Sequence, residues 1–235
     1  MMGKIKRRYE IVFLMVKCLM VFLITSCTYD SYEKGDGDYS LMRGDFVEAQ
    51  VDARKQIVSF TTDDGDQWSL SKPYSADWIV TADTVYRCMI YYNEVEDEQG
   101  KITAEVISIG EVSCATVKSL TEFDKEFRTD PVKFESIWLS KSGKYLNLFL
   151  QLKTGVTNDT SVVQQLAFVS DTLVVNPDNT SIRHIMLHHD QNRVPEYYYT
   201  KAYVSIPTSA ISADSVRLSM NTYSGQIVKT LSLRK

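Results

Sequence analysis

The chain has 235 residues, of which 44% are hydrophobic and 24% are charged, and its 30 acidic residues outnumber 26 lysines and arginines. This length is sufficient for one large or two small domains with apolar cores. The net charge of −4 argues against a nucleic-acid-binding protein, because that binding is driven by Lys and Arg displacing counterions from phosphates.

The N-terminus carries the pattern of a lipoprotein signal. The apolar run Ile11 to Ile24 is shorter than the ~20 residues of a spanning helix, and it follows a basic start, as in a secretory signal peptide. The basic residues are Lys4, Lys6, Arg7 and Arg8. The run continues through Thr25 and Ser26 to Cys27. We therefore expect residues 1–26 to be removed and Cys27 to carry acyl chains such as palmitate.

One charge interrupts the apolar run. Lys17 lies in its middle, and Met15 offers a second start that would make Lys17 the basic beginning of a shorter leader. Both starts lead to Cys27, and the alternative is an uncleaved anchor in which this cysteine is an ordinary thiol. A lipid on Cys27 predicts membrane attachment in the cell envelope. We expect an outer-membrane lipoprotein whose body lies in the periplasm or at the cell surface.

Removal of the leader makes the chain more acidic. It takes away five basic residues and one acid, which leaves 21 basic against 29 acidic residues and a net charge of −8. This balance argues against nucleic acid as a partner and against docking of the body on an anionic bilayer. Besides Cys27, only Cys88 and Cys114 remain. An exported compartment permits a disulfide between them, and two free thiols are the alternative.

Residues 27–43 are predicted to be a flexible tether, because Gly35, Asp36, Gly37 and Asp38 lack apolar neighbours. Residues 44–118 are then dominated by strand patterns. The expected strands are Phe46 to Asp52, Lys55 to Thr62, a return strand from Gln67, Thr84 to Glu94 and Lys101 to Gly110. Asp64-Gly65 and Gln99-Gly100 provide turns. Five short strands predict a small barrel, because a flat sheet would expose its edges.

Residues 119–131 interrupt this β pattern. Leu120, Phe123 and Phe127 are spaced by three and four residues, which is the spacing of one helical face. Either a short helix or an irregular connector fits, and Pro131 closes the segment. We place the domain boundary here.

Residues 132–235 are predicted to form an antiparallel β-sandwich. From Tyr145 to Leu152, leucines occupy every second position, so one face of this strand is buried. The other strands are expected at Lys133 to Leu139, Gln164 to Val169, Thr172 to Val175, Ser181 to His188, Tyr198 to Ile206, Ser215 to Asn221 and Gln226 to Leu233. About seven strands separated by turn residues are typical of a sandwich.

We find no motif for catalysis, and we expect neither a cofactor nor a metal. His184, His188 and His189 are the only histidines, and the first two would lie ~13 Å apart along a strand, too far to share one ion. Nucleophile signatures are absent. The acid pair Asp63-Asp64 lies in a turn-like segment, and solvated carboxylates are the simpler interpretation than a glycosidase pair.

Aromatic residues are the better candidates for binding. Three consecutive tyrosines, Tyr197, Tyr198 and Tyr199, must place at least one ring near the surface, which indicates an interface for a partner. Aromatic platforms for sugars could also come from Trp68, Trp78, Tyr86, Tyr91 and Tyr92. The alternative is that these residues are ordinary strand residues, some of them in the core.

The chain resembles the NigD-like lipoproteins of Bacteroidetes. The resemblance lies in Ser26-Cys27, in Gly44-Asp45-Phe46-Val47 entering the first strand, in the Asp64-Gly65 turn and in the strand Tyr145 to Leu152. It implies an N-terminal OB-type barrel, a C-terminal sandwich and, by the family's association with a bacteriocin gene, an immunity-type role. It carries no catalytic residues. Lys72 to Trp78 departs from the OB pattern, because it is too short for the helix that usually precedes the fourth strand.

We therefore expect a lipid-anchored, non-enzymatic protein that binds a protein or a glycan. The alternatives are an accessory glycan-binding lipoprotein of polysaccharide uptake and a hydrolase whose site is unrecognised.

Overall fold

The computed structural model describes residues 41–96, 99–159 and 161–234. The predicted signal peptide, Cys27 and nearly all of the predicted tether lie outside these residues. Residues 42–235 form one compact unit, and all elements below belong to it. Across the described ranges, we find no helix with the length and apolar character needed to cross a membrane.

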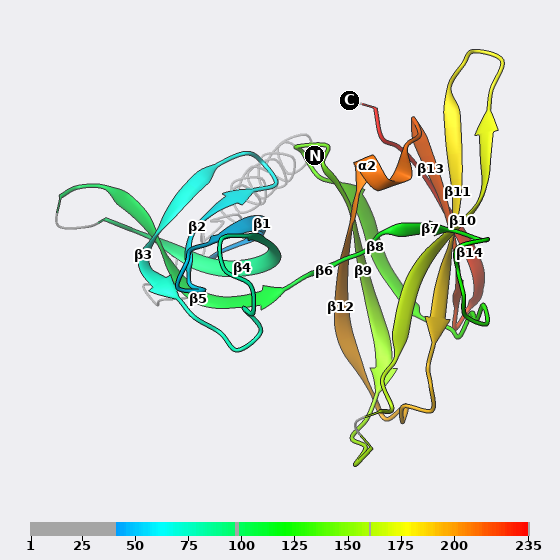
Figure 1. The fold of residues 1–235 in the computed structure, drawn as a ribbon, viewed down its shortest axis with the longest axis horizontal. Helices are drawn as coiled ribbons and strands as arrows, with labels where there is room; N and C mark the ends of the chain where they lie inside the picture. The colour runs from blue at the N-terminus through cyan, green and yellow to red at the C-terminus, as the bar shows by residue number, and fades with distance from the viewer. Residues whose placement is uncertain (1–40, 97–98, 160, 235) are drawn as a thin grey trace, which may run out of the picture. The chain divides into compact units, whose positions relative to one another are not determined.

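The first half is a closed five-stranded barrel, as predicted (Figure 1). Its strands are β1 (Arg43–Val51), β2 (Ile57–Thr62), β3 (Gln67–Tyr74), β4 (Val85–Glu96) and β5 (Ile102–Glu111). They are hydrogen-bonded in the order β1-β2-β3-β5-β4, and β4 pairs back with β1 to close the barrel. This is a Greek-key barrel of the OB type. Residues 75–84 connect β3 to β4 by turns and contain no helix, so the departure expected from the sequence is real.

Alternation along the strands fills the barrel. Ala49, Phe60 and Ile90 are buried in one cluster, because every second side chain of a strand points to the same face. Tyr92 is fully buried, its ring meets Phe60 edge-on with centroids 5.0 Å apart, and its hydroxyl donates a hydrogen bond to Asp45.

The second half is a sandwich of two sheets (Figure 1). One sheet has the order β14-β13-β11-β10-β7 and the other β6-β12-β9-β8. The strands are β6 (Ser113–Cys114), β7 (Val117–Ser119), β8 (Lys133–Leu139), β9 (Tyr145–Thr154), β10 (Gln165–Val175), β11 (Ser181–Asp190), β12 (Tyr198–Pro207), β13 (Ser215–Thr222) and β14 (Gly225–Ser232). A short helix, α2 (Thr208–Ile211), follows β12. The expectation of antiparallel sheets is only partly right, because β7, β6 and β13 pair in parallel with β10, β12 and β11.

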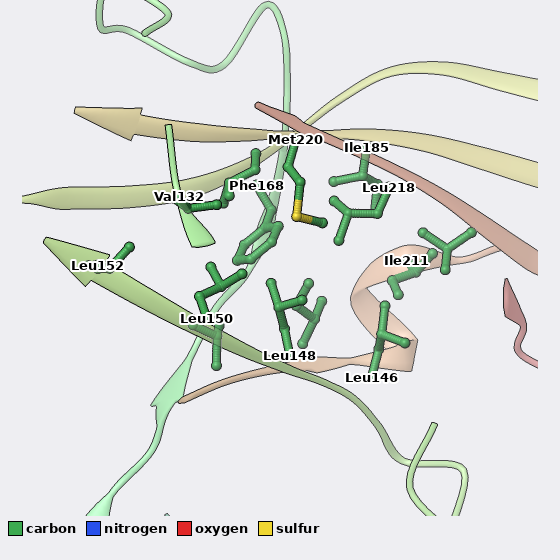
Figure 2. Packing of buried hydrophobic residues seen from close by; sticks show 14 residues of the cluster. Val132, Leu146, Leu148, Leu150, Leu152, Phe168, Ile185, Ile211, Leu218 and Met220 are labelled. Carbon is green, nitrogen blue, oxygen red and sulfur yellow. The ribbon is translucent and has the colours of Figure 1, made fainter. Parts of the chain in front are cut away.

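The predicted leucine strand organises the sandwich core. Leu146, Leu148 and Leu150 of β9 are fully buried and point toward Phe168 and Leu218 of the facing sheet (Figure 2). Each buried Leu side chain contributes about 1.5–3 kcal/mol, so this strand provides a large share of the stability of the sandwich.

The structure moves the predicted domain boundary. Residues 113–118 were expected at the end of the barrel domain and residue 119 at the start of the connector, but β6 and β7 are edge strands of the two sandwich sheets. The segment that follows is an irregular connector rather than a helix. Its backbone bonds to β11, with Asp130 N donating to His189 O and His189 N donating to Arg128 O. These bonds replace the intrahelical pairing that the apolar spacing suggested.

A buried ion pair of the barrel is hydrogen-bonded to the sandwich. The guanidinium of Arg87 on β4 donates to both carboxylate oxygens of Asp63 at 2.7 Å, and its side chain is only 3% exposed. It also donates to Ser205 of β12 and Asn147 of β9, and it stacks on the ring of Tyr145 at 4.1 Å. We call these residues the junction.

Candidate functional site

The three consecutive tyrosines lie at one end of the sandwich. Tyr197 precedes β12, and Tyr198 and Tyr199 open that strand opposite Thr154 and Lys153 of β9. Their exposed fractions are 81%, 54% and 45%. All three rings are therefore exposed, although the sequence required this of only one.

A fourth tyrosine meets Tyr199 from a distant part of the chain. Tyr223 lies in the turn between β13 and β14 and is 40% exposed, and its ring meets that of Tyr199 edge-on with centroids 6.1 Å apart. Sequence reasoning missed Tyr223, and its only signal was an aromatic residue next to the Ser224-Gly225 turn. We call these four residues the tyrosine surface.

Lysine ammonium groups cover two of the rings. Lys153 Nζ lies 4.6 Å from the centroid of Tyr223, and Lys133 Nζ lies 5.6 Å from that of Tyr199. Lys153 also pairs with Glu196 at 3.3 Å. These contacts hold the rings in place, because an ammonium over a ring face is attracted by the ring quadrupole. Partial burial, with the nearby Glu196 carboxylate, raises the pKa of Tyr223 to about 12.

A glycine lets the tyrosine segment reach the end of β9. A Cβ atom added to Gly155 would lie 2.7 Å from side-chain atoms of both Pro195 and Tyr197. The Tyr197 amide donates to the carbonyl of Thr154 at 2.9 Å. The close approach of the two backbones therefore depends on the missing side chain. Val156, next along the chain, adds an exposed apolar side chain.

The chemistry of this surface suits recognition. Tyrosine supplies a large, rigid and amphipathic contact area at a low cost in side-chain entropy, and aromatic residues are enriched in protein interfaces.

Of the two alternatives left open for Cys88 and Cys114, the structure has the two free thiols rather than the disulfide. Cys88 points into the barrel core and is fully buried, whereas Cys114 is exposed on β6 of the sandwich. Burial raises the pKa of the Cys88 thiol to about 12. Strand alternation points the Cys88 side chain into the barrel, away from Cys114. The sequence alone does not show how the faces of strands in the two domains are oriented relative to each other.

The histidines do not form a metal site. Over the ranges that the structure covers, no three His, Cys, Asp or Glu side chains are close enough to hold an ion. His188 Nδ1 accepts a hydrogen bond from Arg128 N, and its ring lies 4.8 Å from that of Phe123. His189 is buried and bonds Asp130 O and Gln164. Burial lowers the pKa of His188. Both residues therefore attach the connector and the neighbouring loop to β11.

The acid pair and the aromatics of the first half have structural contacts. Asp63 holds Arg87 in the junction, and Asp64 pairs with Lys141 of the sandwich. Arg43 stacks on both Trp68 and Tyr92 at 5.5 Å. Trp78 and Tyr86 pack edge-on with centroids 5.6 Å apart, and Tyr91 of β4 lies opposite Gly44 of β1. Trp68, Trp78 and Tyr86 pack against the barrel core, and Tyr92 is part of it.

Comparisons with known proteins show which family and which solved structures the chain resembles. The family model of the NigD-like C-terminal beta sandwich domain matches residues 115–233. A crystal structure of a NigD-like immunity protein from Bacteroides caccae is 22% identical, with a TM-score of 0.63, and the match covers 80% of this chain and 91% of that one. A candidate lipoprotein from Bacteroides fragilis is 13% identical, with a TM-score of 0.59, and the match covers 83% and 99%.

A third structure, a candidate toxin-related protein from Parabacteroides distasonis, is 16% identical with a TM-score of 0.55, and the match covers 81% and 92%. A search of curated protein sequences finds no match. At these identities, the likeness to solved structures shows only that the folds are similar. The assignment to a family rests on the match to the family model. The resemblance inferred from the sequence is confirmed, and the chain belongs to the NigD-like family.

Proposed function

We propose that this protein is a lipid-anchored, non-enzymatic recognition protein of the outer membrane, and that it binds a protein partner through the tyrosine surface. The observation that carries the proposal is a run of three exposed tyrosines, one of which, Tyr199, meets the exposed Tyr223 from a distant part of the chain. An aromatic cluster of this kind provides anchors that a partner can bury.

The anchor is proposed from the leader that ends at Cys27. A similar structure is that of a candidate lipoprotein, which supports the same address. Several acyl chains on one cysteine hold a protein firmly, whereas one chain binds only marginally. In cells, Cys27→Ser should lose labelling by a palmitate analogue and leave the membrane fraction. Equal labelling and equal sedimentation of the variant would exclude the anchor.

The role proposed for the partner contact is immunity, in which the protein blocks an exported toxin. It is supported by the likeness to an immunity protein from Bacteroides caccae. The test compares a deletion strain carrying wild type, Tyr198→Ser/Tyr199→Ser or Val175→Ser. Val175 is a matched control, because it is an exposed apolar residue at the end of β10. Bacteriocins of neighbouring strains should kill cells with the tyrosine variant but not those with the control.

Protection that is equal for the deletion strain and the wild type would refute the immunity role. Protection that survives the double tyrosine change would refute the surface. Both variants must first be shown to reach the membrane in equal amounts, so that a failure of folding is not read as a loss of binding.

A further inference from the structure

A polar hollow of about 440 Å³ lies on the barrel, away from the tyrosine surface in the sequence and in the fold. Residues of three adjacent strands line it. Two of them are aromatic, Phe60 and Trp68, and the other five carry uncharged polar side chains: Gln50 of β1, Ser59 and Thr61 of β2, and Gln67 and Ser69 of β3.

Strand register arranges these groups in rows. Ser59 lies opposite both Gln50 and Ser69, and Thr61 lies opposite Gln67. Directly paired residues of neighbouring strands project to the same face, with Cβ atoms ~4.5–5.5 Å apart. Their neighbours Ala49 and Phe60 are buried in the barrel core. The five polar side chains therefore stand together on the outer face.

These groups have unused hydrogen-bonding capacity. Among the residues that the structure describes, none of the five side chains has a hydrogen bond to another protein group. Glu48 of β1 lies opposite Thr61, but its carboxylate already accepts hydrogen bonds from Lys144 and Tyr145. The lining itself holds no charged side chain.

The chemistry of the lining selects the class of ligand. Amide and hydroxyl groups both donate and accept hydrogen bonds, as do the hydroxyl groups of a sugar ring. A charged ligand would find no counter-charge in the lining. An apolar ligand would take the five polar groups out of water without compensation, which is unfavourable. We propose that this hollow binds a neutral oligosaccharide, independently of the partner contact at the tyrosine surface.

The experiment uses the full-length protein, extracted in a detergent that carries no sugar. Arrays of short neutral gluco-, manno-, galacto- and xylo-oligosaccharides are compared with oligogalacturonides as the anionic counterpart, and hits are measured by calorimetry. At least one neutral series should bind, and the anionic series should not. Gln50→Ala and Gln67→Ala should each weaken binding roughly 2- to 12-fold, as expected for one lost hydrogen bond.

Gln226→Ala provides the matched control, because Gln226 is exposed on β14 of the sandwich, and it should bind as the wild type does. Tyr198→Ser should also bind the sugar normally, which separates this proposal from the immunity role. The proposal is overturned by the absence of binding to every neutral series, by equal binding of oligogalacturonides, or by unchanged affinity in both glutamine variants. Unaltered circular dichroism of the variants excludes misfolding as the cause of a loss.

Discussion

The substitution Asp63→Asn tests whether the junction holds the two domains together. Asp63 is the carboxylate that neutralises Arg87, and the exposed fractions of the two side chains are 17% and 3%. Asparagine has nearly the same shape, but it removes the charge. It also turns one carboxylate oxygen into an NH2 group, which would face the Arg87 Nη2 or the Asn147 amide that now donate to this carboxylate.

Removing one partner of a buried ion pair costs about 3–5 kcal/mol, because the other charge is left buried without compensation. Here Arg87 keeps acceptors on Ser205 and Asn147 and its stacking on Tyr145. These contacts soften the loss, and we expect the lower end of the range, about 3 kcal/mol.

The free energy of unfolding is measured by urea denaturation followed through tryptophan fluorescence. Asp64→Asn is the control one residue away, because Asp64 pairs with Lys141 at the surface, where its side chain is 45% exposed. Such a pair contributes about 0–1 kcal/mol. If Asp63→Asn changes the free energy of unfolding by no more than Asp64→Asn does, the junction is not an energetic link and the reasoning fails.

Three further predictions concern the thiols, the acid response and the core. A thiol reagent should modify Cys114 in the native protein, whereas Cys88 should react only after unfolding, because it is buried and its pKa is raised to about 12; equal reaction rates would contradict this. Burial lowers the pKa of His188 in the folded state, so the unfolded chain takes up the proton first, and stability should fall as pH drops below ~6.5 toward that lowered pKa. This part of the pH dependence should vanish in His188→Gln, and an unchanged slope would refute it. Leu148→Ala should cost about 2–5 kcal/mol in urea unfolding, because Leu148 is fully buried (Figure 2); a loss below ~0.5 kcal/mol, typical of a surface substitution, would contradict its place in the core.

Strands were predictable from the sequence where apolar and polar residues alternate over many positions. The leucines of β9 and the Val-, Tyr- and Ile-rich strand β4 show period-two patterns in the sequence, and both strands were expected within a few residues of their bounds. The strands β6 and β7 are too short to carry a pattern. Their parallel pairing with β12 and β10 depends on tertiary contacts, so the domain boundary was placed too late.

The candidate site was predictable only in its local part. Three consecutive tyrosines are visible in the sequence, but the approach of Tyr223 depends on how the β13–β14 turn meets the start of β12. Likewise, Asp63 was interpreted as a solvated turn residue, because its partner Arg87 lies on another strand. The sequence identified the tyrosines and Asp63 by residue type. Their contacts with Tyr223 and Arg87 depend on the order of strands in the fold, which no local sequence pattern specifies.

Site-specific photo-crosslinking in living cells tests the central claim most directly. A photoreactive residue is placed at position 198 on the tyrosine surface or at position 175 as the control, and cells are irradiated with and without the toxin-producing neighbour. A discrete crosslinked species with a second protein should form at position 198 alone. Binding of a partner at the tyrosine surface would be contradicted if no crosslink formed at position 198, or if the same species formed with equal yield at position 175.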